Sequence, residues 1–233
     1  MSYLGAESLR GQIVRHIPLY RQRRNYTCGP SSLMMVMSAL DERYQPSPKA
    51  ELELWREATT IHGGCGPVGL ALALKRRGFA AVVVVSHGGV FLEARASRTE
   101  EMEAIRILQE RDLVEAKERG VQVYVGNYSL DDLSNWMAEG WYPIVMISIE
   151  FEGKTVTHWV VITGVDTDYV FFNDPLKDQA QGDDATRVDH STFADMNEFG
   201  PKREKAVVLA GLPQMAGIEL SLPKMNLDHE APG

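Results

Sequence analysis

Three residues of this 233-residue chain have the types and the order that thiol chemistry on an acyl group requires. Cys28 lies in the run Gln22-Arg-Arg-Asn-Tyr-Thr-Cys28-Gly29-Pro30-Ser31, and His158-Trp159 and Asn173-Asp174-Pro175 follow far downstream. A thiol is a useful nucleophile near neutral pH only as its thiolate. A helix N-terminus and a nearby imidazole are the usual means of lowering the pKa of the thiol. The residue types and their order therefore indicate a site for nucleophilic catalysis.

The residues around Cys28 predict that it lies at the start of a helix. Gly29-Pro30 precedes the mostly apolar run from Ser31 to Leu40. Proline is tolerated in a first helical turn, where its missing N–H has no partner to lose. Cys28 is then expected at the positive end of the helix dipole. The alternative interpretation is a small, inert core residue, because free cysteine is among the most buried residue types. The helix start, Gln22 upstream and the downstream His and Asp favour the nucleophile.

The order of the expected elements predicts an α+β fold, with most helices first and hairpin-connected strands from Pro143 onward. Helices are expected at 31–40, 48–60, 68–77, 99–119 and 130–139, and strands at 12–20, 80–86, 121–125, 144–150, 155–166, 169–173 and 206–210. Gly153 fits the turn between two of these strands. This arrangement places Cys28 on a helix from the first half and His158 on a strand from the second.

Composition limits the class of protein. With 44% hydrophobic residues the chain can bury a full core, and its length suits one large domain or one domain with an insertion. The net charge of −8, with no sustained basic stripe, argues against nucleic acid as the main partner. The N-terminus lacks a signal-peptide pattern, and no apolar stretch reaches the ~18 residues of a membrane span. We therefore expect a cytoplasmic protein with two free thiols.

No cofactor and no metal ion are expected. His62 lies three residues before Cys65, which invites a metal site. Two thiols and scattered histidines without a Cys-x-x-Cys or His-x-x-x-His pair do not make a zinc site.

The motif resembles that of the papain-like cysteine peptidases of family thirty-nine, which include the peptidases that cleave double-glycine leaders from bacteriocins. The shared features are a Gln six residues before the Cys, the His158-Trp-Val-Val-Ile-Thr-Gly-Val strand, and the Asn-Asp-Pro after the next strand. The resemblance covers roughly Leu19 to Pro175. It implies the papain-like α+β fold, with an N-terminal helical half whose Cys helix packs on a C-terminal antiparallel sheet carrying the His and the Asp.

The resemblance also implies a role for each residue of the motif. Cys28 is the nucleophile, His158 the general base and acid, Asp174 the group that orients His158, and Gln22 an oxyanion donor. Each role is physically reasonable for its residue type. Asn173 is the alternative orienting group, as in papain itself. Strand alternation favours Asp174, because neighbours along a strand point to opposite faces.

Three further residues are substrate-binding candidates: Gly64, Cys65 and Trp159. Gly63-Gly64-Cys65-Gly66-Pro67 repeats the Cys-Gly-Pro of the first site. Cys65 has three functional interpretations, as a wall of the substrate pocket, a resolving thiol or a second nucleophile. The plainer interpretation is a small buried side chain in a helix-cap loop, and we favour it.

We expect residues 1–211 to form the peptidase domain, with an insertion at about 87–120, and 212–233 to form an extended tail. The bacteriocin-processing relatives are usually the leading domain of a membrane transporter, whereas this chain carries no transmembrane or nucleotide-binding segment. The expected activity is hydrolysis of a peptide or isopeptide bond in a peptide or protein substrate. The alternatives are an amide-forming acyltransferase, as in phytochelatin synthases, and a catalytically silent peptide-binding module. The sequence leaves the oligomeric state open.

Overall fold

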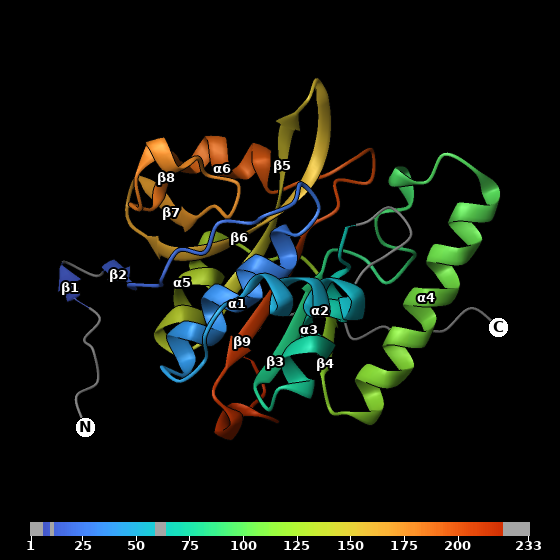
Figure 1. Ribbon diagram of the computed structural model, residues 1–233, viewed down its shortest axis with the longest axis horizontal. Helices are drawn as coiled ribbons and strands as arrows, with labels where there is room; N and C mark the ends of the chain where they lie inside the picture. Colours follow the sequence, from blue (N-terminus) through green and yellow to red (C-terminus); the bar gives the residue numbers. More distant parts are fainter. Residues whose placement is uncertain (1–6, 10–11, 59–63, 221–233) are drawn as a thin grey trace.

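A computed structural model of the chain describes residues 7–9, 12–58 and 64–220. Its strands form one continuous sheet, and its helices pack around that sheet (Figure 1). The helices are α1 Cys28–Leu40, α2 Pro48–Ala58, α3 Pro67–Arg76, α4 Thr99–Glu118, α5 Leu130–Ala138 and α6 His190–Met196. The strands are β1 Glu7–Leu9, β2 Gln12–Val14, β3 Ala80–Val85, β4 Gln122–Val125, β5 Tyr142–Phe151, β6 Lys154–Val165, β7 Tyr169–Asn173, β8 Thr186–Asp189 and β9 Ala206–Gly211. Short 3-10 turns lie at Glu93–Arg95, Gln179–Gln181 and Pro213–Met215.

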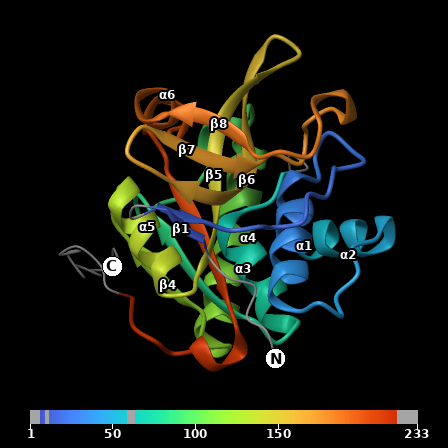
Figure 2. The ribbon, with the colours of Figure 1, turned by 90° about the vertical axis from the view of Figure 1, so that its left-hand side faces the viewer.

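Successive residues of the central strands β3 and β9 are all apolar and point to opposite faces of the sheet. Both faces are therefore apolar, and helices cover each of them. Val83 of β3 and Val208 of β9 face the core beneath α1, α2 and α3, whereas Val82 and Leu209 face the core beneath α5 and α6. Figure 2 shows the strands between α1 and α2 on one side and α5 on the other. The molecule is therefore layered as helix, sheet and helix.

The strand order is β1-β2-β6-β5-β9-β3-β4, with β7 paired to β6 and β8 to β7. The predicted α+β class is confirmed. The sheet differs in one respect from the C-terminal antiparallel sheet that was expected. Strands β3 and β4 from the first half extend it, and they pair with each other in parallel. The long helix α4 makes this crossover possible, since parallel neighbours need a connection of a dozen or more residues.

Most element boundaries fall within two residues of the prediction. The strand expected at 12–20 is the main error, because only Gln12–Val14 pairs as β2. Beyond it, Arg15 N–H donates to the Thr163 carbonyl (2.7 Å), and the chain then leaves the sheet for the Gln22 loop. The end of the helix expected at 48–60 lies outside the described residues. Strands β1 and β8 and helix α6 were not predicted, although Asp189 caps α6 by accepting from Thr192 N–H (2.8 Å).

Strands β5 and β6 form a long hairpin whose tip projects from the body of the molecule (Figure 1). Its turn is made by Glu152 and Gly153, whose φ angles of 50° and 74° are both left-handed. A two-residue hairpin turn of this kind matches the right-handed twist of the strands, and glycine adopts it without a steric penalty. The predicted turn at Gly153 is confirmed, and its register fixes the position of His158 on β6.

Helix α1 is the most deeply buried helix on its face of the sheet. Its residues from Cys28 to Met37 are all buried. Ser32 Oγ donates to the Trp159 carbonyl of β6 (3.1 Å). This bond and the packing of Leu33 and its neighbours attach the start of α1 to the strand that carries His158.

None of the helices that the structure describes is long and apolar enough to cross a membrane.

Burial in α1 makes a prediction about stability. Leu33 is fully buried, so Leu33→Ala removes several methyl groups from a close-packed core and leaves a cavity. We expect it to lower the free energy of unfolding by about 2–5 kcal/mol in urea or thermal denaturation. Leu52→Ala, on the exposed side of α2, is the matched control and is expected to change it by less than about 0.5 kcal/mol. Equal losses in the two variants would contradict the placement of α1 at the centre of the core.

Candidate active site

Cys28 is the first residue of α1, and its side chain is only 8% exposed. Thr27 precedes it as the N-cap residue, so the prediction that Cys28 lies at a helix N-terminus is confirmed. Backbone N–H groups of Gly29 and Trp159 hydrogen-bond the sulfur. Backbone donors and the positive end of a helix both favour a negative charge at this position.

His158 lies on β6 between the thiol and a carboxylate. His158 Nε2 is 2.6 Å from Asp174 Oδ1, and the imidazole is near enough to the Cys28 thiol for each group to shift the pKa of the other. Because Asp174 engages Nε2, the ring nitrogen left for the thiol is Nδ1. The side chain of Asn173, in contrast, donates to the Ile17 carbonyl (2.7 Å) and is buried. Alternation along the chain thus directs Asp174 toward His158 and Asn173 away from it, as predicted.

The three groups shift one another's pKa values. Burial alone raises the pKa of Cys28, but the hydrogen bond and the positive charge of His158 outweigh it and hold that pKa below its ordinary value. Burial also disfavours the imidazolium, yet the hydrogen bonds to Asp174 and Cys28 raise the pKa of His158 to about 9. His158 in turn keeps the pKa of Asp174 low against the effect of its burial. These directions favour a thiolate and imidazolium pair at neutral pH.

Gln22 lies in the loop before α1, and its backbone is hydrogen-bonded to the residue that follows Asp174. Its backbone N–H donates to the Pro175 carbonyl (2.8 Å), and its side-chain Nε2 donates to the Arg24 carbonyl (2.8 Å). An amide nitrogen carries two hydrogens, so the bond to Arg24 leaves one N–H of Gln22 for another acceptor.

Glu51 holds this loop in place and was not predicted as a functional residue. It is fully buried on α2. Its Oε1 accepts from Arg23 N–H (2.9 Å) and from the Thr27 hydroxyl, and its Oε2 accepts from the Tyr20 hydroxyl (3.0 Å). One carboxylate therefore ties together the chain on both sides of Gln22. The sequence did contain one indication that Glu51 is buried: its helical spacing with Leu54 places both residues on the same face of α2.

Cys65 and Trp159 belong to the same core cluster as Cys28. Both side chains are buried, and Trp159 Nε1 donates to the Cys65 carbonyl (3.0 Å). Burial raises the pKa of Cys65 well above its ordinary value, and the neighbouring Cys28 adds to this effect. Cys65 is thus a protonated, enclosed thiol, which agrees with the plainer of its interpretations. Both cysteines are free.

Arg95 is a second residue at the site that was not predicted, and its guanidinium lies against Gly64. A Cβ atom built on Gly64 lies 2.4 Å from Arg95 Nη1, so the guanidinium occupies the space that a side chain at position 64 would need. Arg95 comes from the 3-10 turn within the segment 87–120. No sequence motif identifies Arg95, because its position beside Gly64 depends only on how the segment 87–120 folds.

No group of three or more His, Cys, Asp or Glu side chains that could hold a metal ion occurs among residues 7–9, 12–58 and 64–220. His62, the metal-ligand candidate, lies outside the described residues.

Comparison with known proteins finds similarity to a C39-like peptidase family. The family model DUF3335, described as a Peptidase_C39 like family, matches residues 17–211. The peptidase domain of Streptococcus ComA, a bi-functional ABC transporter involved in a quorum sensing pathway, is 15% identical, with a TM-score of 0.46 over 84% of this chain and 99% of that chain. A C39-like peptidase structure from Bacillus anthracis is 16% identical, with a TM-score of 0.39 over 85% of this chain and 96% of the other. The curated proteins contain no match.

The opposite pKa shifts of the two cysteines predict selective alkylation. At a pH near 6, iodoacetamide is expected to modify Cys28 at least about tenfold faster than Cys65, because only Cys28 is stabilised as a thiolate. His158→Ala is expected to remove most of this advantage, leaving the effects of the helix and backbone donors. Mass mapping of the labelled peptides against pH measures both rates. Equal labelling of the two cysteines, or a Cys28 rate unaffected by His158→Ala, would show that the thiol and imidazole do not act as a pair.

Proposed function

Since the chain belongs to the Peptidase_C39 like family, we propose that it is a cysteine peptidase that hydrolyses a peptide or isopeptide bond through a thioester on Cys28. The family match confirms the resemblance predicted from the motif. The observation that carries the proposal is the grouping of Cys28, His158 and Asp174: His158 Nε2 lies 2.6 Å from Asp174 Oδ1, and the imidazole is near enough to Cys28 to lower the pKa of its thiol. A buried thiol beside a raised-pKa imidazole is the arrangement that a nucleophilic cysteine needs.

In the first half of the proposed reaction the Cys28 thiolate attacks the carbonyl carbon of the scissile bond. His158, already protonated, gives its proton to the leaving amine as the tetrahedral intermediate collapses to the thioester. In the second half His158 removes a proton from water, the hydroxide attacks the thioester, and the Cys28 thiolate leaves. Asp174 holds the imidazole in the orientation that serves both steps and stabilises its charged form.

The oxyanion of each tetrahedral intermediate needs hydrogen-bond donors placed in advance. We assign this role to the Cys28 backbone N–H and the remaining side-chain N–H of Gln22. The contacts of Glu51 with Tyr20 before Gln22, and with Arg23 and Thr27 after it, support this assignment, because they fix the loop before substrate arrives. Substrate binding then requires no reorganisation of the loop.

The orienting role of Asp174 can be tested by substituting it and, as a matched control, its neighbour Asn173. Asp174→Asn is expected to lower kcat by about 10²-fold or more with a small change in KM, because it weakens the charged form of His158 and disturbs its tautomer. Asn173→Ala breaks a buried bond to the Ile17 carbonyl, so its expected effect is on the free energy of unfolding, by about 1–3 kcal/mol, with kcat nearly unchanged. Steady-state kinetics and urea unfolding of both variants test this. The reverse pattern would make Asn173 the orienting residue.

Trapping tests the proposed activity itself. The native chain is incubated with a peptide library or a cell lysate, quenched in acid, and searched by mass spectrometry for acyl groups attached to Cys28, with Cys28→Ala as the control. We expect a thioester on Cys28 and free carboxyl products from the same substrates. Amide products formed with an added amine, in place of free acids, would indicate the acyltransferase. Absence of any acyl group on a chain whose Cys28 alkylates normally would indicate the silent binding module.

For a peptide identified in this way, kcat/KM is expected to be bell-shaped in pH. The active form is thiolate with imidazolium. Activity therefore falls on the basic side as pH rises through about 9, where His158 loses its proton. It falls on the acid side as pH drops through the lowered pKa of Cys28. A basic limb near 6.5, the ordinary pKa of histidine, would contradict the pairing.

A further inference from the structure

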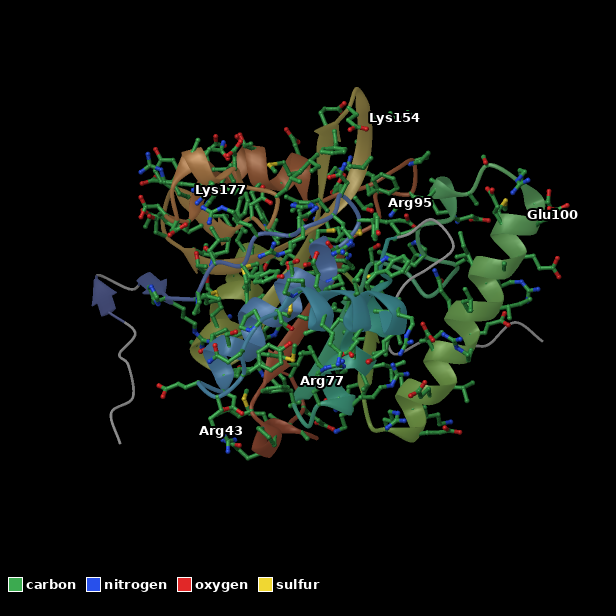
Figure 3. All side chains as sticks on the ribbon, in the orientation of Figure 1. Arg43, Arg77, Arg95, Glu100, Lys154 and Lys177 are labelled. Atoms are coloured by element: carbon green, nitrogen blue, oxygen red, sulfur yellow. The ribbon has the colours of Figure 1, made fainter. Side chains whose placement is uncertain are left out.

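Arg95 brings a positive charge beside the thiol, and the reaction proposed above does not use it. It ends the 3-10 turn Glu93–Arg95, which precedes α4, and it reaches back toward the β5–β6 hairpin (Figure 3). Arg95 Nη1 donates to Thr157 Oγ1 (3.0 Å), and Thr157 is the residue before His158 on β6. The guanidinium is close enough to Cys28 and Cys65 for both thiols to affect its pKa.

The surroundings of the guanidinium hold it in place. Its Nη1 donates to Thr157 Oγ1, and a Cβ added at Gly64 would lie 2.4 Å from the same nitrogen and 3.3 Å from Cζ. Gly64 directly precedes Cys65, which belongs to the same core cluster as Cys28. Arg95 is thus fixed between the strand that carries His158 and the loop that supports the nucleophile.

Arg95 has no acidic partner within the described part of the chain. No carboxylate there lies within 4.0 Å of it, whereas Arg21, Arg76 and Arg98 each form an ion pair. It is partly buried, and burial lowers its pKa while no carboxylate opposes that effect. Its Nε and Nη2 have no hydrogen-bond partner among these residues, yet they are not enclosed. A partly desolvated cation with free donors is costly unless an anion meets it.

The Cys28 thiolate is near enough to raise the pKa of Arg95 against the effect of burial, but it does not occupy the free donors of the guanidinium. The charge of the thiolate is already matched by His158, which makes the largest favourable contribution to the lowered pKa of Cys28, followed by the backbone donors of Trp159 and Gly29. Among the described residues the Arg95 side chain donates to Thr157 and makes no hydrogen bond to the Cys28 sulfur. The accessible guanidinium nitrogens are therefore left for a group that arrives with the substrate.

We propose that Arg95 binds a carboxylate of the substrate next to the scissile bond, so that the site selects acidic peptides. This inference rests on the proposed function and names its substrate class. A planar guanidinium with two adjacent free donors matches a carboxylate in a bidentate geometry, which a neutral amide satisfies less well. The carboxylate belongs either to an Asp or Glu side chain or to a free C-terminus, and the chemistry of recognition is the same.

Peptide binding to the Cys28→Ala chain, which lacks the nucleophile, tests this inference independently of the proposed peptidase activity. The probe is a set of fluorescent alanine-based octapeptides in which one Glu, or one isosteric Gln, occupies each position in turn, each with a free or an amidated C-terminus. Anisotropy titrations against the Cys28→Ala chain give Kd values. We expect Glu at one position, or the free C-terminus, to bind at least about tenfold more tightly than its neutral counterpart.

Three variants on the Cys28→Ala background locate this preference. Arg95→Gln is expected to abolish it, and Arg95→Lys to retain part of it, because an ammonium keeps the charge without the planar fork. Gly64→Ala keeps the charge but displaces the guanidinium, and it is expected to weaken the preference several-fold. Arg98→Gln, three residues away on the same segment and paired with Glu101 on the surface, is the matched control and is expected to leave it unchanged.

Several results would overturn the proposal. These are equal affinity for Glu and Gln peptides at every position with both C-termini, no measurable binding by any peptide, and a preference that survives Arg95→Gln. In the chain with Cys28 intact, Arg95→Gln is expected to leave the pH dependence of Cys28 alkylation nearly unchanged. A clear shift of that profile together with unchanged peptide selectivity would make Arg95 a partner of the thiolate instead. If acidic peptides bind through Arg95 but none is cleaved, the recognition stands and the peptidase proposal fails.

Discussion

The electrostatic coupling of the buried Cys28 thiol with the His158 imidazole is the interaction on which the rest of this site depends. Cys28 and His158 are both withdrawn from water, and burial by itself would leave the thiol protonated and the imidazole neutral. Charge separation is favoured only because each group stabilises the other and because Asp174 and the backbone donors add to that stabilisation. A small displacement of any of them would return the pair to its neutral form, so the fold must hold them closely in place.

Three features of the fold provide this rigidity. Helix α1 is bonded through Ser32 to β6, so the nucleophile and the base share one support. The β5–β6 hairpin, with its register set at Glu152 and Gly153, places His158 opposite the start of that helix. The buried Glu51 carboxylate of α2 accepts hydrogen bonds from Tyr20, Arg23 and Thr27 and so holds the loop that contains Gln22. The residues that do the proposed chemistry come from distant parts of the sequence, but each is attached to a neighbour through backbone hydrogen bonds or a buried carboxylate.

The sequence predicted the local and periodic features well. The placement of Cys28 at a helix start followed from Gly29-Pro30, although α1 begins three residues before the helix expected at 31–40. Alternation along the chain correctly separated Asp174, just past the end of β7, from Asn173. Features that depend on long-range contacts were not accessible. The parallel pairing of β3 and β4 depends on how α4 crosses the sheet, and the approach of Arg95 to Gly64 depends on the path of a segment without a motif. The role of Glu51 lay between these cases, because its helical spacing marked it as buried but could not identify the loop that it binds.

Titration of His158 by NMR tests the central claim most directly. With the imidazoles labelled with 15N, the ring nitrogens of His158 are followed from pH 5 to 10 in the native chain and in Cys28→Ala. We expect a doubly protonated imidazole throughout the neutral range, with loss of the proton near pH 9, and a lower pKa of His158 in Cys28→Ala because the thiolate no longer supports the positive charge. A neutral His158 at pH 7, or an identical titration in both proteins, would contradict this expectation.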